Sequence, residues 1–162
     1  MIQAPASPSN FSTRPAGVSP SAVIYHDTIG TVESAVAWFQ DPAAGVSSHY
    51  IVARDGRVFR CVEEAYKAWH AGSSILHGVT DVNAFSLGIE LEDWKDVGDP
   101  YPAAQLAALL DLATEISMRW RIPLHSHVGH CHIATPRGRK TDPGPDFPWY
   151  DYLNTLGARL TA

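Results

Sequence analysis

Residues 50–62 read YIVARDGRVFRCV and predict a β-hairpin. Two apolar runs, Tyr50 to Ala53 and Val58 to Val62, flank a short polar segment that contains Asp55-Gly56. An Asp-Gly pair between such runs is typical of a tight turn that joins two antiparallel strands. This hairpin indicates that the sheet of the protein contains antiparallel pairing.

Strands and helices are interspersed on both sides of the hairpin. Short apolar runs at 22–25 and 85–91 predict buried strands. Capping residues and apolar stripes predict helices at 31–40, 102–120 and 149–160. We therefore predict the α/β class, as a single domain in which helices flank a mixed central β-sheet.

The domain is expected to begin near residue 21. Residues 1–20 are rich in Pro, Ser and Ala and carry one charged side chain, Arg14, so we expect an extended N-terminal arm. Residues 21–162 form the predicted folded domain. A chain of 162 residues is long enough to bury a core without disulfides, and we expect Cys61 and Cys131 to be free thiols.

Charge and hydropathy argue against several classes of partner. The net charge of −5 gives no general attraction to nucleic acid or to an anionic membrane. No apolar run approaches the roughly 20 residues that a membrane-spanning helix needs. The N-terminus shows no signal peptide, so we expect synthesis in the cytoplasm, and we expect a monomer.

The segment 130–144, HCHIATPRGRKTDPG, concentrates imidazole, lysine and aspartate side chains and lacks the periodicity of helix or strand. His130 and Asp142 from this segment could join His26, which ends an apolar strand, as three metal ligands. Two imidazoles and one carboxylate leave a fourth tetrahedral position for water, as in catalytic zinc sites.

Amide hydrolysis at such a site also needs a base and an oxyanion-stabilising group. Glu90, at the end of a strand, and Lys140, two residues before Asp142, are candidates for these roles. Each could equally be a solvated surface charge, and their spacing alone does not decide.

Several motifs, in order along residues 22 to 150, resemble the zinc-dependent N-acetylmuramoyl-L-alanine amidases of the type-2 amidase and peptidoglycan recognition protein superfamily. They are His26 after its strand, Ser48-His49-Tyr50-Ile51-Val52-Ala53-Arg54-Asp55-Gly56, Ala68-Trp69-His70-Ala71-Gly72, Asn83-Ala84-Phe85-Ser86-Leu87-Gly88-Ile89-Glu90-Leu91, Gly129-His130, Arg139-Lys140-Thr141-Asp142-Pro143-Gly144 and Phe147-Pro148-Trp149.

The resemblance implies a Zn²⁺ ion held by His26, His130 and Asp142, with Glu90 as general base and Lys140 as oxyanion stabiliser. It implies cleavage of the amide bond between N-acetylmuramic acid and L-alanine of peptidoglycan. A further set of residues would line or order the muropeptide groove: Trp69, His70, Ala71, Gly72 and Asn83.

Two departures from the family pattern matter. Ser48 stands where some relatives have a tyrosine that assists the water, which indicates the branch that relies on glutamate. Lys140 follows His130 by ten residues, where relatives often have eight, so we expect Thr135 to Gly138 to bulge outward. His132 lies eight residues before Lys140 and is the alternative ligand, but the Gly-His pair favours His130.

We expect a phage or prophage endolysin, made without a signal peptide and acting on the cell wall. Two alternatives remain: a cytoplasmic amidase that recycles muropeptides, and a peptidoglycan recognition module without activity. An unrelated α/β domain is the remaining class. Activity on purified walls, on soluble anhydro-muropeptides, or on neither would separate these readings.

Overall fold

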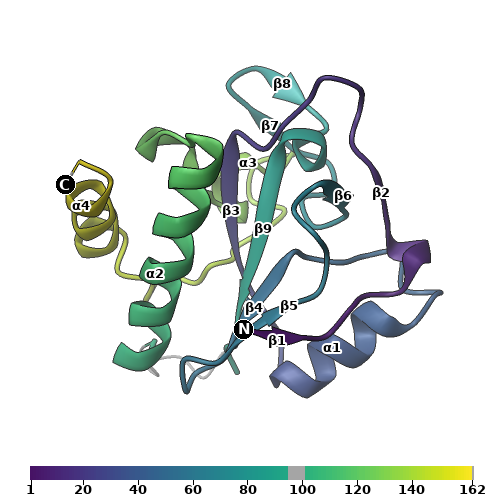
Figure 1. The fold of residues 1–162 in the computed structure, drawn as a ribbon, viewed down its shortest axis with the longest axis horizontal. Coiled ribbons are helices and arrows are strands. Elements are labelled where there is room, and N and C mark those ends of the chain that lie inside the picture. Colours follow the sequence, from purple (N-terminus) through teal and green to yellow (C-terminus); the bar gives the residue numbers. More distant parts are fainter. Residues whose placement is uncertain (95–100, 162) are drawn as a thin grey trace.

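The computed structural model describes residues 1–94 and 101–161 and is built around a six-stranded sheet (Figure 1). Its strands, in spatial order, are β1 (Ile2–Gln3), β5 (Val58–Arg60), β4 (Tyr50–Val52), β9 (Ser86–Leu91), β3 (Ala22–Asp27) and β10 (His127–Gly129). Strands β4, β9, β3 and β10 run parallel, whereas β4 and β5 are antiparallel. The prediction of a mixed central sheet in an α/β domain is therefore confirmed.

The hairpin forms where the sequence predicts it. Tyr50 pairs with Arg60 and Val52 with Val58, and the turn closes with a 2.9 Å hydrogen bond from the Gly56 N–H to the Ala53 carbonyl. Gly56 has φ +88°, a conformation that glycine adopts without a steric penalty.

The α-helices in the described part of the chain are α1 (Val32–Gln40), α2 (Ala103–Trp120), α3 (His130–Ile133) and α4 (Trp149–Leu160). Helices α2 and α4 lie together on one side of the sheet and α1 lies on the other (Figure 1). Leu109, Ala113 and Ile116 of α2 are fully buried against the sheet, so the predicted apolar stripe faces the core. The sheet is covered on both faces, which explains why β3 is buried along its whole length.

The first 20 residues lie against the domain. Strand β1 pairs with β5 at the sheet edge, and β2 (Phe11–Thr13) pairs with β6 (Tyr66–Ala68). The Arg14 guanidinium donates hydrogen bonds to the backbone carbonyls of Glu64 (3.1 Å), Ala84 (2.8 Å) and Ser86 (2.9 Å). The Arg14 side chain therefore links this segment to the loop at Glu64 and to the start of β9.

The remaining elements are small. They are β7 (Ile75–Leu76), β8 (Val79–Thr80) and the 3₁₀ turns Pro8–Asn10, Val82–Phe85 and Leu124–Ser126. The segment from 130 onward differs from the expected loop because it opens with α3. A single helical turn of four residues is too short to show a helical period in the sequence.

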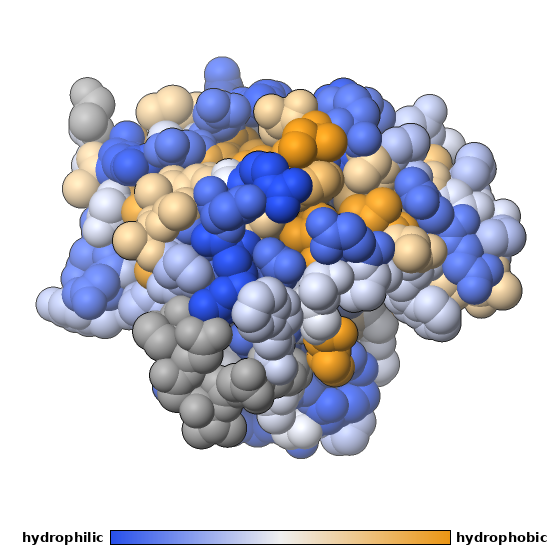
Figure 2. Space-filling model, turned by 90° about the horizontal axis from the view of Figure 1, so that it is seen from below, coloured by the Kyte–Doolittle hydropathy of each residue, from blue (hydrophilic) through white to orange (hydrophobic). Residues whose placement is uncertain are grey.

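Three further properties complete the description. Among residues 1–94 and 101–161, no helix combines the length and the apolar character that crossing a bilayer requires. Hydrophobic residues on the face shown in Figure 2 form separate patches between hydrophilic ones. Both cysteines are free thiols, Cys61 buried and Cys131 partly exposed.

Candidate metal centre and active site

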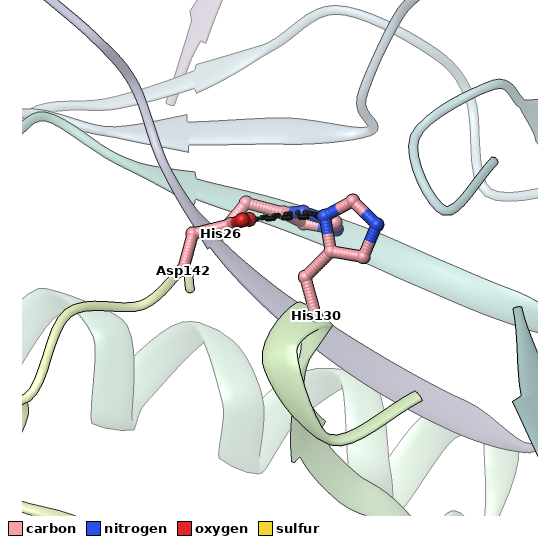
Figure 3. A group of neighbouring side chains, drawn as sticks. All are labelled: His26, His130 and Asp142. Atoms are coloured by element: carbon pink, nitrogen blue, oxygen red, sulfur yellow. Dashed lines mark hydrogen bonds and ion pairs between the residues drawn. The ribbon is translucent and has the colours of Figure 1, made fainter. Parts of the chain in front are cut away.

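Three polar side chains from separate elements converge beyond the carboxyl end of β3 (Figure 3). His26 is the fifth residue of β3, His130 is the first residue of α3, and Asp142 lies on the loop that follows. Strand β10 pairs in parallel with β3 and aligns Gly129 with Tyr25, and the residue that follows each of these two is a histidine of the cluster.

The three facing atoms form a nearly equilateral triangle. Nδ1 of His26 lies 3.1 Å from Nδ1 of His130 and 3.1 Å from Oδ2 of Asp142, and the third side measures 3.0 Å. Ligands about 2.0–2.1 Å from a tetrahedral zinc ion are separated by roughly 3.3 Å. The triangle is within a few tenths of an ångström of that spacing, and its donor set suits zinc with one open position. The residues present therefore fit a catalytic zinc ion.

The protonation states also suit a metal. Burial lowers the pKa of His26 to about 4, so the imidazole is neutral near pH 7 and its lone pair is available. Burial alone would raise the pKa of Asp142, but hydrogen bonds to His130 and His26 outweigh it and hold that pKa well below its ordinary value. Neutral imidazole and ionised carboxylate are the forms that bind a metal.

The other ring nitrogens of the two histidines contact protein groups. Nε2 of His130 lies 3.0 Å from the carbonyl oxygen of Ala71, and Nε2 of His26 lies 3.0 Å from Nδ1 of His70. Such contacts orient metal-binding imidazoles and select the tautomer whose free nitrogen faces the metal.

The loop that carries Asp142 is held on both sides. The Cys131 N–H donates to the Asp142 carbonyl at 2.8 Å, and the Gly144 N–H donates to Oδ2 of Asp27 at 2.6 Å. The Tyr101 hydroxyl donates to the other oxygen of Asp27 at 2.8 Å. Sequence reasoning missed Asp27 and Tyr101, although an aspartate that continues an apolar strand after His26 was a usable signal.

A pocket of about 600 Å³ adjoins the triad. Of the predicted residues outside the triad, four line it: Trp69, His70, Glu90 and Lys140. Glu90 pairs directly with His26 across β9 and β3, so both side chains leave the sheet on the same face. The pocket thus brings the predicted base and cation to the same opening as the triad.

The other predicted groove residues are absent from the described lining of this pocket. Ala71 is fully buried, Gly72 takes a left-handed conformation with φ +54°, and Asn83 lies behind the loop. Oδ1 of Asn83 accepts hydrogen bonds from the backbone N–H groups of His70 (3.1 Å) and Ala71 (2.8 Å). Asn83 therefore orders the loop; contact of these residues with a muropeptide stays a prediction.

Helix α1 supplies a pocket wall that sequence reasoning missed. Trp38 and Phe39 line the pocket together with Ile29, and Trp38 and Ile29 are 54% and 82% exposed. The apolar stripe of the helix predicted at 31–40 includes Phe39, but no pattern in the sequence indicates that its neighbour Trp38 faces a pocket.

His132 lies apart from the triad. It is exposed, its Nδ1 accepts a 2.9 Å hydrogen bond from the Gly129 N–H, and its ring packs on Trp149 at 5.0 Å between centroids. The structure therefore brings His130, and not His132, to His26. The predicted outward bulge is the exposed turn around Pro136 and Arg137, which is closed by the Arg139 N–H donating to the Pro136 carbonyl.

Some relatives have a tyrosine at the position of Ser48, and the nearby Tyr50 does not take its place at the metal site. Its hydroxyl donates a 2.6 Å hydrogen bond to Oε1 of Glu64, which also accepts a hydrogen bond from Arg119 of α2. Its ring packs in the core beneath α2, away from the triad. Ser48 is fully buried.

Comparison with known proteins agrees with this geometry. The family described as N-acetylmuramoyl-L-alanine amidase (Amidase_2) matches residues 16–145. The N-acetylmuramoyl-L-alanine amidase AmiD of Escherichia coli is 39% identical over 141 residues, which cover 78% of this chain and 50% of that protein. The 1,6-anhydro-N-acetylmuramyl-L-alanine amidase AmpD of Citrobacter freundii is 39% identical over 104 residues, 64% of this chain and 54% of that protein. The chain spans about half the length of these two relatives.

Solved structures show the same fold. A crystal structure of an AmpD derivative has a TM-score of 0.83 at 31% identity and covers 96% of this chain and 93% of that chain. AmiD of Escherichia coli, solved with the substrate anhydro-N-acetylmuramic acid-L-Ala-D-gamma-Glu-L-Lys, has a TM-score of 0.76 at 36% identity, covering 89% and 60%. The endolysin amidase LysCS of Clostridium intestinale, at 20% identity and a TM-score of 0.71 over 96% and 94%, shares the fold alone. Because the family match extends over most of the chain, this protein belongs to the N-acetylmuramoyl-L-alanine amidase family Amidase_2.

Proposed function

We propose that this chain is a zinc hydrolase that cleaves the amide bond between the lactyl group of N-acetylmuramic acid and L-alanine in soluble muropeptides. One observation carries the proposal. The facing atoms of His26, His130 and Asp142 lie 3.0–3.1 Å apart at the mouth of a pocket that Glu90 and Lys140 also line.

The relatives favour a recycling role over the lytic role that the sequence suggested. AmpD is named for an anhydro-muramyl substrate, and AmiD was solved with an anhydro-muropeptide. The likeness to an endolysin extends only to the fold. We therefore assign soluble anhydro-muropeptides, and not intact walls, as the substrate class.

Zinc bound by the triad would lower the pKa of a water molecule and polarise the scissile carbonyl. Glu90 is our candidate for the general base because it shares the sheet face of His26 and is partly exposed to the pocket. Its carboxylate would accept the proton of the attacking water and deliver it to the departing amine of L-alanine.

Lys140 is our candidate for oxyanion stabilisation. Its side chain is exposed and lines the pocket next to Thr141 and Asp142. It also adds to the electrostatic environment of His26: the low pKa of that imidazole arises first from burial, and the positive charge of Lys140 lowers it further. An ammonium group here would donate a hydrogen bond to the amide oxygen as negative charge develops on it.

Trp69 and the α1 residue Trp38 are the aromatic side chains that we expect to contact the muropeptide. Both line the pocket, Trp69 half-buried and Trp38 exposed. All three metal-binding side chains are present, which favours an enzyme over a recognition module without activity.

The test supplies zinc-loaded protein with two substrates, an anhydro-muramyl tripeptide in solution and purified peptidoglycan sacculi. We expect mass spectrometry to detect an L-alanine-terminated peptide from the soluble substrate, and no product from the His26→Ala control. Clearing of sacculi without turnover of the soluble substrate would restore the lytic role. Turnover of neither substrate would refute amidase activity.

A further inference from the structure

We infer that His70 is a positioning residue: it holds the ring of His26 so that Nδ1 of His26 is kept for a metal ion. The inference rests on the proposed zinc site but not on the proposed substrate. Nε2 of His26 lies 3.0 Å from Nδ1 of His70, and the two rings are steeply inclined, with 82° between their planes.

A chain of hydrogen bonds fixes which atom donates at each step. The hydroxyl of Ser86 lies 2.7 Å from the carbonyl oxygen of Val82, which can only accept, so Ser86 donates there. Its oxygen can then accept from Nε2 of His70 at 3.3 Å. When Nε2 of a neutral His70 carries the proton, Nδ1 of the same ring can only accept a hydrogen bond. The donor in the contact between His26 and His70 is then Nε2 of His26, which must carry the proton of that ring.

The backbone and a glycine hold His70 in place. The N–H of His70 donates to Oδ1 of Asn83 at 3.1 Å. On the other side, a Cβ added to Gly88 would lie 2.5 Å from Cγ of the His70 ring, closer than any side chain tolerates. The ring therefore packs directly on the β9 backbone, and this contact requires glycine at position 88.

The same loop serves both imidazoles of the triad. His70 contacts Nε2 of His26, and the carbonyl of the next residue, Ala71, accepts from Nε2 of His130 at 3.0 Å. Two consecutive residues thus orient both rings. The loop that the sequence marked as a groove wall also serves as the support of the metal site.

The test measures zinc affinity by competition with a chromophoric chelator. His70→Leu removes the acceptor at similar volume and is expected to weaken zinc binding roughly 10- to 100-fold. His70→Asn can place an amide oxygen near the position of Nδ1 and is expected to remain close to wild type. An unchanged affinity in His70→Leu, or equal losses in both variants, would overturn the inference.

The matched control is His127→Gln. His127 is also a buried imidazole with two hydrogen-bond partners, the Tyr25 hydroxyl (2.7 Å) and the Ser117 hydroxyl (2.9 Å), but it faces α2. We expect this control to lose stability and keep its zinc affinity. If the control loses as much zinc affinity as His70→Leu, general destabilisation explains the loss in both variants, and the inference is overturned.

Nitrogen-15 NMR of the wild-type imidazoles gives a second readout that needs no variant to fold. We expect zinc on Nδ1 and the proton on Nε2 of His26 in the zinc-loaded protein; zinc on Nε2 would overturn the inference. Weakened zinc binding by His70→Leu in a protein that cleaves no muropeptide would support the inference and contradict the proposed function alone.

Discussion

Replacing Asp27 by alanine tests how the loop that carries Asp142 is held. The carboxylate of Asp27 accepts hydrogen bonds from the Gly144 N–H at 2.6 Å and from the Tyr101 hydroxyl at 2.8 Å, and Asp27 is only 8% exposed. Its loss leaves a buried hydroxyl and a partly buried N–H without this acceptor, at about 1–3 kcal/mol each. We therefore expect the free energy of unfolding to fall by about 2–6 kcal/mol.

The same substitution is expected to weaken zinc binding. Gly144 is two residues beyond Asp142, so freeing its N–H allows the loop to populate conformations in which the carboxylate is displaced. If half of the loss arises in the loop, the shift of about 1–3 kcal/mol lowers zinc affinity roughly 5- to 140-fold, since 1.4 kcal/mol corresponds to a factor of ten. Unfolding by urea in the presence of EDTA measures the first effect, and chelator competition measures the second.

Tyr101→Phe is the matched control for this prediction. It removes the other donor to Asp27 and a longer 3.3 Å contact to the Gly144 N–H, but leaves the 2.6 Å hydrogen bond that holds the loop. We expect a stability loss of about 1 kcal/mol and nearly unchanged zinc affinity. If Asp27→Ala binds zinc as tightly as wild type, or if Tyr101→Phe loses as much zinc affinity as Asp27→Ala, the hydrogen bond between Gly144 and Asp27 does not position Asp142.

Three further predictions concern the reaction, the choice of ligand and the response to acid. Glu90→Gln and Lys140→Ala should retain one zinc ion each by metal analysis, yet lose roughly 10²- to 10⁴-fold in kcat because proton transfer or oxyanion stabilisation is removed; zinc loss in either would reassign that residue. His130→Ala should lose zinc while His132→Ala keeps it, and the reverse result would move the ligand position. Burial lowers the pKa of His127 from 6.5 to about 4, so the unfolded chain binds a proton that the folded protein does not. Through His127, the stability present above about pH 6.5 should fall by about 3 kcal/mol as the pH drops through 4. Because His26 and His49 are also buried with lowered pKa values, urea titrations in EDTA should show an acid-induced loss in His127→Gln that is about 3 kcal/mol smaller than in wild type; equal losses would contradict the prediction.

Local patterns accounted for the hairpin, the two long central strands and the three longer helices. The Asp55-Gly56 turn set the hairpin, and the hydroxyl of Thr31 accepts a hydrogen bond from the Ser34 N–H at the start of α1. Apolar runs placed β3 and β9. Each of these features depends on residues that are close together in the sequence, within one turn or one strand. The amino-acid sequence alone is therefore enough to predict them. The pairing of β1 with β5 was not predictable, because its two strands lie more than 50 residues apart and carry no matching signal.

The amino-acid sequence specified which chemical groups are available: two imidazoles, a carboxylate, a glutamate and a lysine in motifs that resemble a known amidase family. Only the tertiary structure decided which of these groups meet. The alignment of β10 with β3 brings His130 to His26 and leaves His132 exposed, and the Gly144–Asp27 hydrogen bond holds the loop that returns Asp142 to them. The tertiary structure also places His70 in contact with Nε2 of His26 as well as in the pocket wall. The physical reason is that metal ligands and hydrogen-bond chains depend on separations of about 3 Å between atoms; residues 44 to 116 positions apart along the chain reach these separations only after the sheet has formed.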